Sequence, residues 1–377
     1  MGALCLQPTQ SFSYTVFQLY SSITNLSRLI MNFPLPKHVL IKLFPAALLL
    51  GLAAGYHLQP EPQELSKGVT PQSLASPSAQ SMSASAHQPA QTDFVGALSD
   101  QGQRRTYYLH TPPSYQPGQS LPLVLAFHES EGQGKDMAAH TGLNQLANQK
   151  GFLVVYPDGL NAKWNVSEQA ATKEDNAAFV QALIAHLGQI RVIDRQRIYA
   201  TGLSNGGILV QKLACENPGQ IAAFATVAAL LPEQFQAKCQ SQTPVSMLMI
   251  NGTADAVVPW QGGAPPAVHV GRNLSIPSIP DVFSFWQKHN GCSAPVTVQQ
   301  RADKRVTTSS YTHCQSGSDV TLMALNGASH IWPGGGYGQS SFLDTSQTIW
   351  SFFERHTLAT AALQPNATKG QSLSASQ

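Results

Sequence analysis

The chain has 377 residues, of which 42% are hydrophobic and only 11% are charged, and its formal net charge is +2. This hydrophobic share is sufficient for a sizeable buried core, whereas coiled coils and wholly disordered chains need far more charge. Phosphate binding needs clustered Lys and Arg, so a near-neutral chain without a dense basic run argues against nucleic acid as the main partner.

The N-terminal part has the features of a secretory leader. Two lysines precede an apolar run at 43–54, and small residues follow it. This order is typical of a signal peptide, and the run is shorter than the roughly 20 residues that span a bilayer. We interpret 1–56 as a leader, with translation starting at Met31 and a signal peptide at about 31–55. We expect export to the periplasm or the outside; a retained membrane anchor is the alternative.

Two further segments have the composition of disordered chain. Residues 57–92 are rich in Pro, Ser and Gln, and the tail at 359–377 is similar. Such sequences cannot bury enough apolar surface to offset the entropy of ordering. Between them, residues 93–358 contain no internal repeat and are predicted to form a single domain.

Apolar runs alternate with helical patterns along this domain. The apolar residues of 175–190 recur at the spacing of one helix face. Near-continuous apolar strands between helices predict an α/β fold, a mostly parallel sheet with helices on both faces. Functional residues are then expected just after the strands, because sites gather at the carboxyl ends of parallel strands. Strands are predicted at 105–110, 121–128, 151–156, 198–203, 245–250 and 320–325.

A candidate nucleophile follows the strand at 198–203. The sequence GLSNGG at 202–207 fits G-x-S-x-G between a strand and a helix. In such a turn the backbone of Ser204 is strained, and side chains at 202 and 206 would clash with neighbouring elements. The alternative is a tight turn whose serine caps the next helix.

A serine nucleophile needs a base, and the base needs an orienting carboxylate. Asp255 follows the strand at 245–250, and His330 follows the strand at 320–325. The chain order Ser, Asp, His is the order of the α/β-hydrolase triad. The alternatives are a turn-forming aspartate and a solvent-exposed histidine.

An oxyanion hole and an apolar wall complete the predicted site. The first oxyanion donor is the N–H of Asn205, which follows the nucleophile, and the partner N–H is expected from Ser130 in the loop after 121–128. Trp260 and Trp332 flank the acid and the base. They are predicted to line the substrate cleft, with ordinary core packing as the alternative.

The folded region holds an even number of cysteines. In an exported chain this predicts two disulfides, with three pairings open, and buried free thiols are the alternative. A zinc site is not expected, because the sequence has no C-x-x-C pair. The cysteines are Cys215, Cys239, Cys292 and Cys314.

The motifs PLVLAFH, GFLVVYPDG, GLSNGG, NGTADAVVPW and GASHIWPGGG occur in this order over roughly 98–356. Together they resemble the polyhydroxybutyrate depolymerase and feruloyl esterase group of secreted α/β-hydrolases. The resemblance implies that Ser204, Asp255 and His330 are nucleophile, acid and base. It also implies the sequential disulfides Cys215–Cys239 and Cys292–Cys314.

The sequence departs from the family pattern at two positions. Glu129 stands where the family has glycine after the histidine, and Ser329 replaces a glycine before the catalytic histidine. A carboxylate pointing at the oxyanion would oppose it, and loss of one oxyanion donor typically slows an enzyme by about 10²–10³.

The sequence and the resemblance predict an exported serine esterase that acts through an acyl-enzyme and needs no cofactor or metal. The resemblance implies an ester substrate, either a hydroxyalkanoate polyester or feruloylated or acetylated xylan. No nucleic-acid partner and no stable membrane insertion are expected once the leader is cleaved. The alternatives are a peptidase or acyltransferase of the same fold and a catalytically inactive protein that binds polymer at the cell surface. Nothing in the sequence predicts the oligomeric state.

Overall fold

The computed structural model describes residues 93–166, 175–239, 241–263, 276–335 and 342–358. The predicted leader (1–56), linker (57–92) and C-terminal tail (359–377) lie outside the described residues. The strands are β1 (Asp93–Asp100), β2 (Gln103–His110), β3 (Leu121–Phe127), β4 (Leu153–Pro157), β5 (Ile193–Leu203), β6 (Ala223–Val227), β7 (Ser246–Gly252), β8 (Thr297–Gln300), β9 (Val306–Tyr311) and β10 (Val320–Leu325). The α-helices are α3 (Gly134–Thr141), α4 (Leu143–Lys150), α5 (Asn176–Ile190), α6 (Asn205–Glu216), α7 (Glu233–Lys238), α8 (Ile279–His289) and α9 (Thr345–Phe353).

Within the described residues the strands form one sheet in the order β1-β2-β4-β3-β5-β6-β7-β10-β9-β8. The six central strands, from β4 to β10, run parallel to one another. The pairs at the two edges, β1–β2 and β9–β8, are antiparallel. The predicted mostly parallel α/β sheet is therefore confirmed, with an antiparallel hairpin added at each edge.

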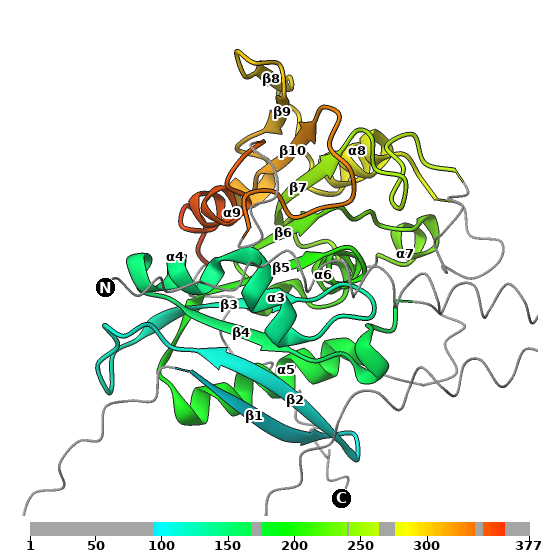
Figure 1. The fold of residues 1–377 in the computed structure, drawn as a ribbon. Helices are drawn as coiled ribbons and strands as arrows, with labels where there is room; N and C mark the ends of the chain where they lie inside the picture. The colour runs from blue at the N-terminus through cyan, green and yellow to red at the C-terminus, as the bar shows by residue number, and fades with distance from the viewer. Residues whose placement is uncertain (1–92, 167–174, 240, 264–275, 336–341, 359–377) are drawn as a thin grey trace, which may run out of the picture. The chain divides into compact units, whose positions relative to one another are not determined.

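Helices cover both faces of this sheet (Figure 1). Along β3, Leu123, Leu125 and Phe127 belong to the hydrophobic core that includes α5, α6 and α8. Val124 and Ala126 belong to the core on the other face, which includes α3, α4 and α9. Successive residues of a strand point to opposite faces, so a strand buried on both sides is apolar throughout, which is the pattern that the sequence displays.

The predicted elements are all present, with shifts of a few residues at their ends. Helix α5 begins after Asp175, whose carboxylate accepts a hydrogen bond of 3.0 Å from the N–H of Ala178. This cap accounts for the helix start. The sequence analysis did not predict β1, β6, β8 or β9. Strand β6 is a short run, AFATV, and β8, TVQQ, is fully exposed.

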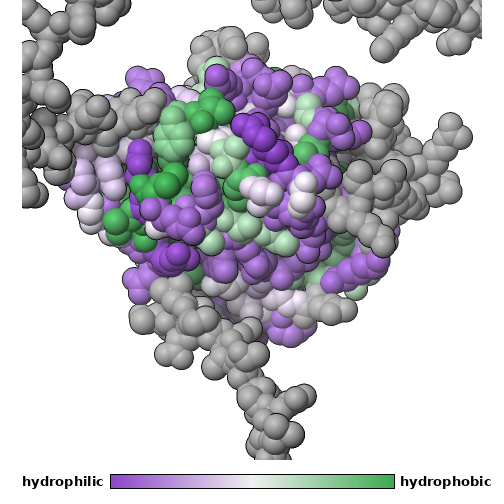
Figure 2. All heavy atoms as spheres, turned by 90° about the horizontal axis from the view of Figure 1, so that it is seen from below, coloured by the Kyte–Doolittle hydropathy of each residue, from purple (hydrophilic) through white to green (hydrophobic). Residues whose placement is uncertain are grey.

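Figure 2 shows one side of the molecule, on which hydrophobic and hydrophilic residues are interspersed. Among the described residues, the large hydrophobic side chains that are exposed are few: Val95, Ile190, Val192, Val296 and Val298. Two of them lie on or beside the edge strand β8, where side chains face solvent on both sides.

Both disulfides join the cysteines in sequential pairs. Cys215 pairs with Cys239, and Cys292 pairs with Cys314. The pairing implied by the family resemblance is confirmed, and the alternative of buried free thiols is wrong. In the part of the chain that the structure describes, no helix is both long and apolar enough to traverse a bilayer.

Candidate active site

Ser204 lies in the sharp turn between β5 and α6. Its backbone has φ 54° and ψ −118°, a region that side-chain-bearing residues rarely adopt. The turn is held on both sides: the N–H of Ser204 donates to the carbonyl of Val227 at 2.9 Å, and its carbonyl accepts from the N–H of Ile208 at 2.9 Å. The surrounding structure thus stabilises a conformation that costs of order 1–3 kcal/mol.

The two glycines of the motif are required by close packing. A Cβ atom at Gly202 would lie 2.4 Å from the backbone carbon of Gly206. A Cβ at Gly206 would lie 2.2 Å from the carbonyl oxygen of Phe127, at the end of β3. The clashes predicted for side chains at both positions are confirmed, and the start of α6 lies directly against the end of β3.

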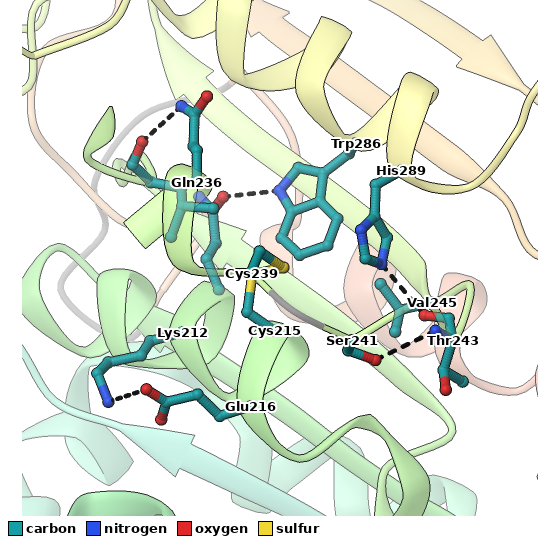
Figure 3. The surroundings of a disulfide bond; sticks show 12 residues. Lys212, Cys215, Glu216, Gln236, Cys239, Ser241, Thr243, Val245, Trp286 and His289 are labelled. Carbon is teal, nitrogen blue, oxygen red and sulfur yellow. Dashed lines mark hydrogen bonds and ion pairs between the residues drawn. A yellow bond between two sulfur atoms is a disulfide. The ribbon is translucent and has the colours of Figure 1, made fainter. Parts of the chain in front are cut away.

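The rest of α6 is fixed by covalent and polar contacts (Figure 3). The disulfide joins Cys215, in the last turn of α6, to Cys239 at the end of α7. One turn earlier, the buried side chain of Gln211 accepts a hydrogen bond of 2.8 Å from the indole N–H of Trp286 on α8. The helix that follows the candidate nucleophile is therefore anchored to two neighbouring helices. Residues of α5 and of the C-terminal end of α6 line a surface hollow. The hollow lies at the opposite end of α6 from Ser204, so it is separate from the candidate site.

Asp255 and His330 are hydrogen-bonded partners. The imidazole Nδ1 of His330 lies 2.8 Å from Oδ2 of Asp255. The carboxylate side chain is fully buried, and 22% of the histidine side chain is exposed. The other carboxylate oxygen, Oδ1, accepts hydrogen bonds of 2.8 Å each from the backbone N–H groups of Val257 and Val258. These bonds stabilise a buried charge and leave Oδ2 for the imidazole.

The loops that carry the acid and the base are joined by backbone hydrogen bonds. The N–H of Thr253 donates to the carbonyl of Leu325, and the N–H of Ala254 donates to the carbonyl of Ala328, each at 3.0 Å. A Cβ at Gly252 would lie 2.3 Å from the carbonyl oxygen of Ala328, so glycine is needed for this close approach. This local packing explains why two residues 75 positions apart meet.

All three predicted triad residues follow strand ends at the same edge of the sheet. Ser204 follows β5, Asp255 follows β7 and His330 follows β10, and these strands are parallel. Within the described residues Oγ of Ser204 and the imidazole of His330 form no hydrogen bond. Such bonds are often long in a free enzyme and tighten in the substrate complex. In the register of the sheet, one residue from each of β5, β6, β7 and β10 lies in the same row near the ends of these strands: Leu203, Val227, Ile250 and Met323.

The two predicted oxyanion donors are Asn205, directly after Ser204, and Ser130, in the turn after β3. Asn205 is the first residue of α6, so its N–H has no acceptor within the helix. Its side chain holds the backbone of Trp164, accepting from the N–H at 2.7 Å and donating to the carbonyl at 3.3 Å. Ser130 is exposed in the turn after β3, and its N–H forms no hydrogen bond with any described residue.

The side chain of Glu129 is directed toward α3. Its Oε1 lies 4.0 Å from Nδ1 of His140, in the last turn of that helix. Its Oε2 is buried next to Gly132 and makes no hydrogen bond within the described residues. The described contacts of the carboxylate are therefore with α3 and its own turn, and the Asn205 amide is not among them.

The two flanking tryptophans differ in burial. Trp332 is 5% exposed and belongs to the hydrophobic core, and its indole N–H donates to Oγ of Ser346 at 3.3 Å. Trp260 is half-buried and packs at the edge of the other core. The burial of Trp332 favours core packing, whereas a substrate contact for Trp260 stays a prediction.

Comparison with known proteins finds esterases that are similar to this chain. The family model described as esterase PHB depolymerase matches residues 105–252. Feruloyl esterase D of Neurospora crassa is 27% identical over 266 residues, which cover 67% of this chain and 83% of the relative. Feruloyl esterase B of Piromyces equi is 27% identical over 225 residues, covering 58% of this chain but only 41% of that longer protein. The chain resembles the PHB depolymerase/feruloyl esterase-like group.

The fold of the described residues matches that of a solved esterase. An acetyl xylan esterase from Aspergillus awamori superposes with a TM-score of 0.52 at 15% identity, covering 69% of this chain and 99% of the other. The α/β-hydrolase fold is thereby confirmed. The similarity to esterases supports carboxylic ester hydrolysis as the activity class. The family match includes Ser204 and ends before Asp255 and His330, so those two assignments depend on position and geometry.

Proposed function

We propose that this protein hydrolyses carboxylic esters through an acyl-enzyme on Ser204, with His330 as general base and Asp255 as its orienting carboxylate. The observation that carries the proposal is the 2.8 Å hydrogen bond between His330 and the fully buried Asp255. It joins two loops at the sheet edge where the strained Ser204 turn also lies.

The hydrogen bonds favour one direction of proton transfer. Because both oxygens of the Asp255 carboxylate accept, Nδ1 of His330 carries the proton and donates it to Oδ2. Nε2 is then the unprotonated nitrogen and takes the proton from the Ser204 hydroxyl as Oγ attacks the ester carbonyl carbon. The carboxylate also stabilises the imidazolium that this transfer produces.

The oxyanion that forms on the carbonyl oxygen is bound by the N–H groups of Asn205 and Ser130. Collapse of the tetrahedral intermediate breaks the bond to the alcohol oxygen, which leaves with the proton from Nε2 of His330. Water then attacks the acyl-enzyme and gives a proton to Nε2. Collapse of this second intermediate breaks the bond to Oγ of Ser204, which takes the proton back from Nε2 as the acid is released. The proposed cycle needs no cofactor and no metal.

The proposed substrates are esters of polymers or oligomers. The relatives are named for feruloyl and acetyl xylan esters, and the family description names polyhydroxybutyrate. We also propose export, because the leader has signal-peptide features and two disulfides are typical of proteins that fold in oxidising compartments.

The test is hydrolysis of p-nitrophenyl butyrate by Ser204→Ala, followed by wild-type turnover of methyl ferulate, acetylated xylan and hydroxybutyrate oligomers. Loss of activity with an unchanged melting temperature is expected for the variant. The matched control is Ser351→Ala, which changes an exposed serine on α9. Wild-type turnover by the Ser204 variant would contradict the proposal.

An inactive polymer-binding protein is separated from an enzyme by labelling with a fluorophosphonate. An active triad reacts covalently at Ser204, whereas a disabled one does not. The orientation of the Glu129 side chain toward α3 supports an active enzyme, because the described contacts of this carboxylate do not include the Asn205 amide.

A further inference from the structure

His128 is a completely buried polar residue at the end of β3 to which the proposed catalytic cycle gives no role. None of its surface is exposed, and its ring lies 5.0 Å, centroid to centroid, from the indole of Trp164. It lies between the end of β3, which leads into the turn with Ser130, and the loop that follows β4. Both of its ring nitrogens are hydrogen-bonded to backbone groups.

These two bonds fix the tautomer of the ring. The backbone N–H of Gly159 lies 2.9 Å from Nε2, and an N–H can only donate, so Nε2 is the unprotonated nitrogen. Nδ1 therefore carries the proton and donates it to the carbonyl oxygen of Glu129 at 2.6 Å. Burial lowers the pKa of His128 below its usual value, which favours this neutral form.

The accepting carbonyl belongs to the peptide unit that carries the proposed oxyanion donor. The carbonyl of Glu129 and the N–H of Ser130 share one planar trans peptide, in which the two groups point in opposite directions. The Glu129 carbonyl accepts from Nδ1 of His128 and, at 3.2 Å, from the N–H of Gly132. With its carbonyl held toward the ring, the peptide directs the Ser130 N–H away from it.

The same histidine is linked to the other proposed oxyanion donor, Asn205. The indole N–H of Trp164 donates to the carbonyl oxygen of His128 at 2.9 Å, and the backbone of Trp164 is held by the side chain of Asn205. A continuous set of hydrogen bonds thus runs from the first residue of α6 to the Glu129–Ser130 peptide.

We propose that His128 is a positioning residue for the oxyanion hole: by donating to the Glu129 carbonyl it sets the direction of the Ser130 N–H. The inference rests on the proposed function. His128 touches neither substrate nor reacting atoms, and it acts through the peptide plane.

The experiment compares His128→Asn with His128→Phe. The asparagine amide offers an N–H close to the place of Nδ1–H, whereas phenylalanine fills the volume without a donor. With p-nitrophenyl butyrate we expect His128→Phe to lower kcat by about 10²-fold, the usual effect of losing one oxyanion donor, with little change in KM. His128→Asn is expected to recover most of that loss.

A second readout is affinity for a boronic acid, whose tetrahedral adduct with Ser204 places an oxygen in the oxyanion hole. Its inhibition constant is expected to rise in parallel with the fall in kcat across the variants, because both measure stabilisation of the same oxyanion. Trp164→Phe removes the indole donor and keeps an aromatic ring. It is expected to lower kcat and to raise the inhibition constant of the boronic acid by the same factor, and it replaces the His128 variants in the test if those do not fold.

Unchanged kcat and boronic acid affinity in a folded His128→Phe or Trp164→Phe protein would overturn the inference. Equal losses in His128→Asn and His128→Phe would also overturn it, since packing would then be the role. The parallel Ser204→Ala measurement separates this from failure of the proposed function, because activity that survives the loss of Ser204 refutes the triad and not only the role of His128.

Discussion

Replacing Asp255 by asparagine tests the proton arrangement of the proposed triad without changing its volume. In the native protein Oδ1 of Asp255 accepts two backbone N–H groups and Oδ2 faces Nδ1 of His330. An asparagine has only one acceptor oxygen. If that oxygen keeps the two backbone bonds, its amide N–H₂ faces Nδ1, which must then be the unprotonated nitrogen.

The consequence is a histidine with its proton on Nε2, where it cannot accept from Ser204. In a serine protease the corresponding aspartate-to-asparagine change costs about 10⁴ in kcat for this reason. A loss of 10⁴ corresponds to about 5 kcal/mol of transition-state stabilisation. We expect a loss of that order for Asp255→Asn, with KM changed far less.

The assay is steady-state hydrolysis of p-nitrophenyl butyrate, with melting temperature measured on the same sample. Asp281→Asn is the control, because that aspartate is exposed on α8 and pairs with Ser278. A correctly folded Asp255→Asn enzyme that keeps kcat within tenfold of wild type would refute the tautomer argument, and Asp255 would then be a structural residue of its loop.

Two further predictions concern stability. Removing one disulfide with Cys215→Ala and Cys239→Ala opens a loop with a sequence separation of 24, so we expect a loss of about 3 kcal/mol and a melting temperature lower by roughly 6–12 °C; a calorimetric scan that matches wild type would contradict the loop-entropy estimate. Burial lowers the pKa of His289 and His356 below the usual 6.5, so the folded state binds fewer protons than the unfolded state. The contribution of these two histidines to the free energy of unfolding is therefore fully present above about pH 6.5, and it is lost as the pH falls through their folded pKa values. Melting temperature measured from pH 7.5 to 5 checks this decrease, and His356→Gln is expected to make it shallower.

Most of the central strands were predictable because they are buried on both faces, although β6, which is short and equally buried, was not predicted. A run such as LPLVLAF has no polar alternation, and every residue of β3 is buried. Strands β1, β8 and β9 escaped prediction because they lie in the antiparallel edge pairs, where side chains are partly or fully exposed and the sequences, such as TVQQ in β8, are polar.

In the candidate site, the features that depend on neighbouring residues were predictable, whereas those that depend on contacts between distant residues were harder to predict. The glycines at 202 and 206 serve a local turn, so the motif alone predicted the strained Ser204. That Asp255 meets His330 depends on backbone bonds between two loops far apart in the chain, which only the resemblance and the order of the strands indicated. The bonds of His128 to Gly159 and Glu129 had no sequence signal in a single chain.

The backbone bonds between the loop after β7 and the loop after β10 have a practical consequence for engineering. The two loops should be exchanged as a unit. Replacing only one of them with a homologous sequence would disturb the backbone hydrogen bonds between the loops and, with them, the position of the His330 imidazole. Recombination that aims to change the ester preference should therefore exchange both loops together, or vary only residues that take no part in the hydrogen bonds between them.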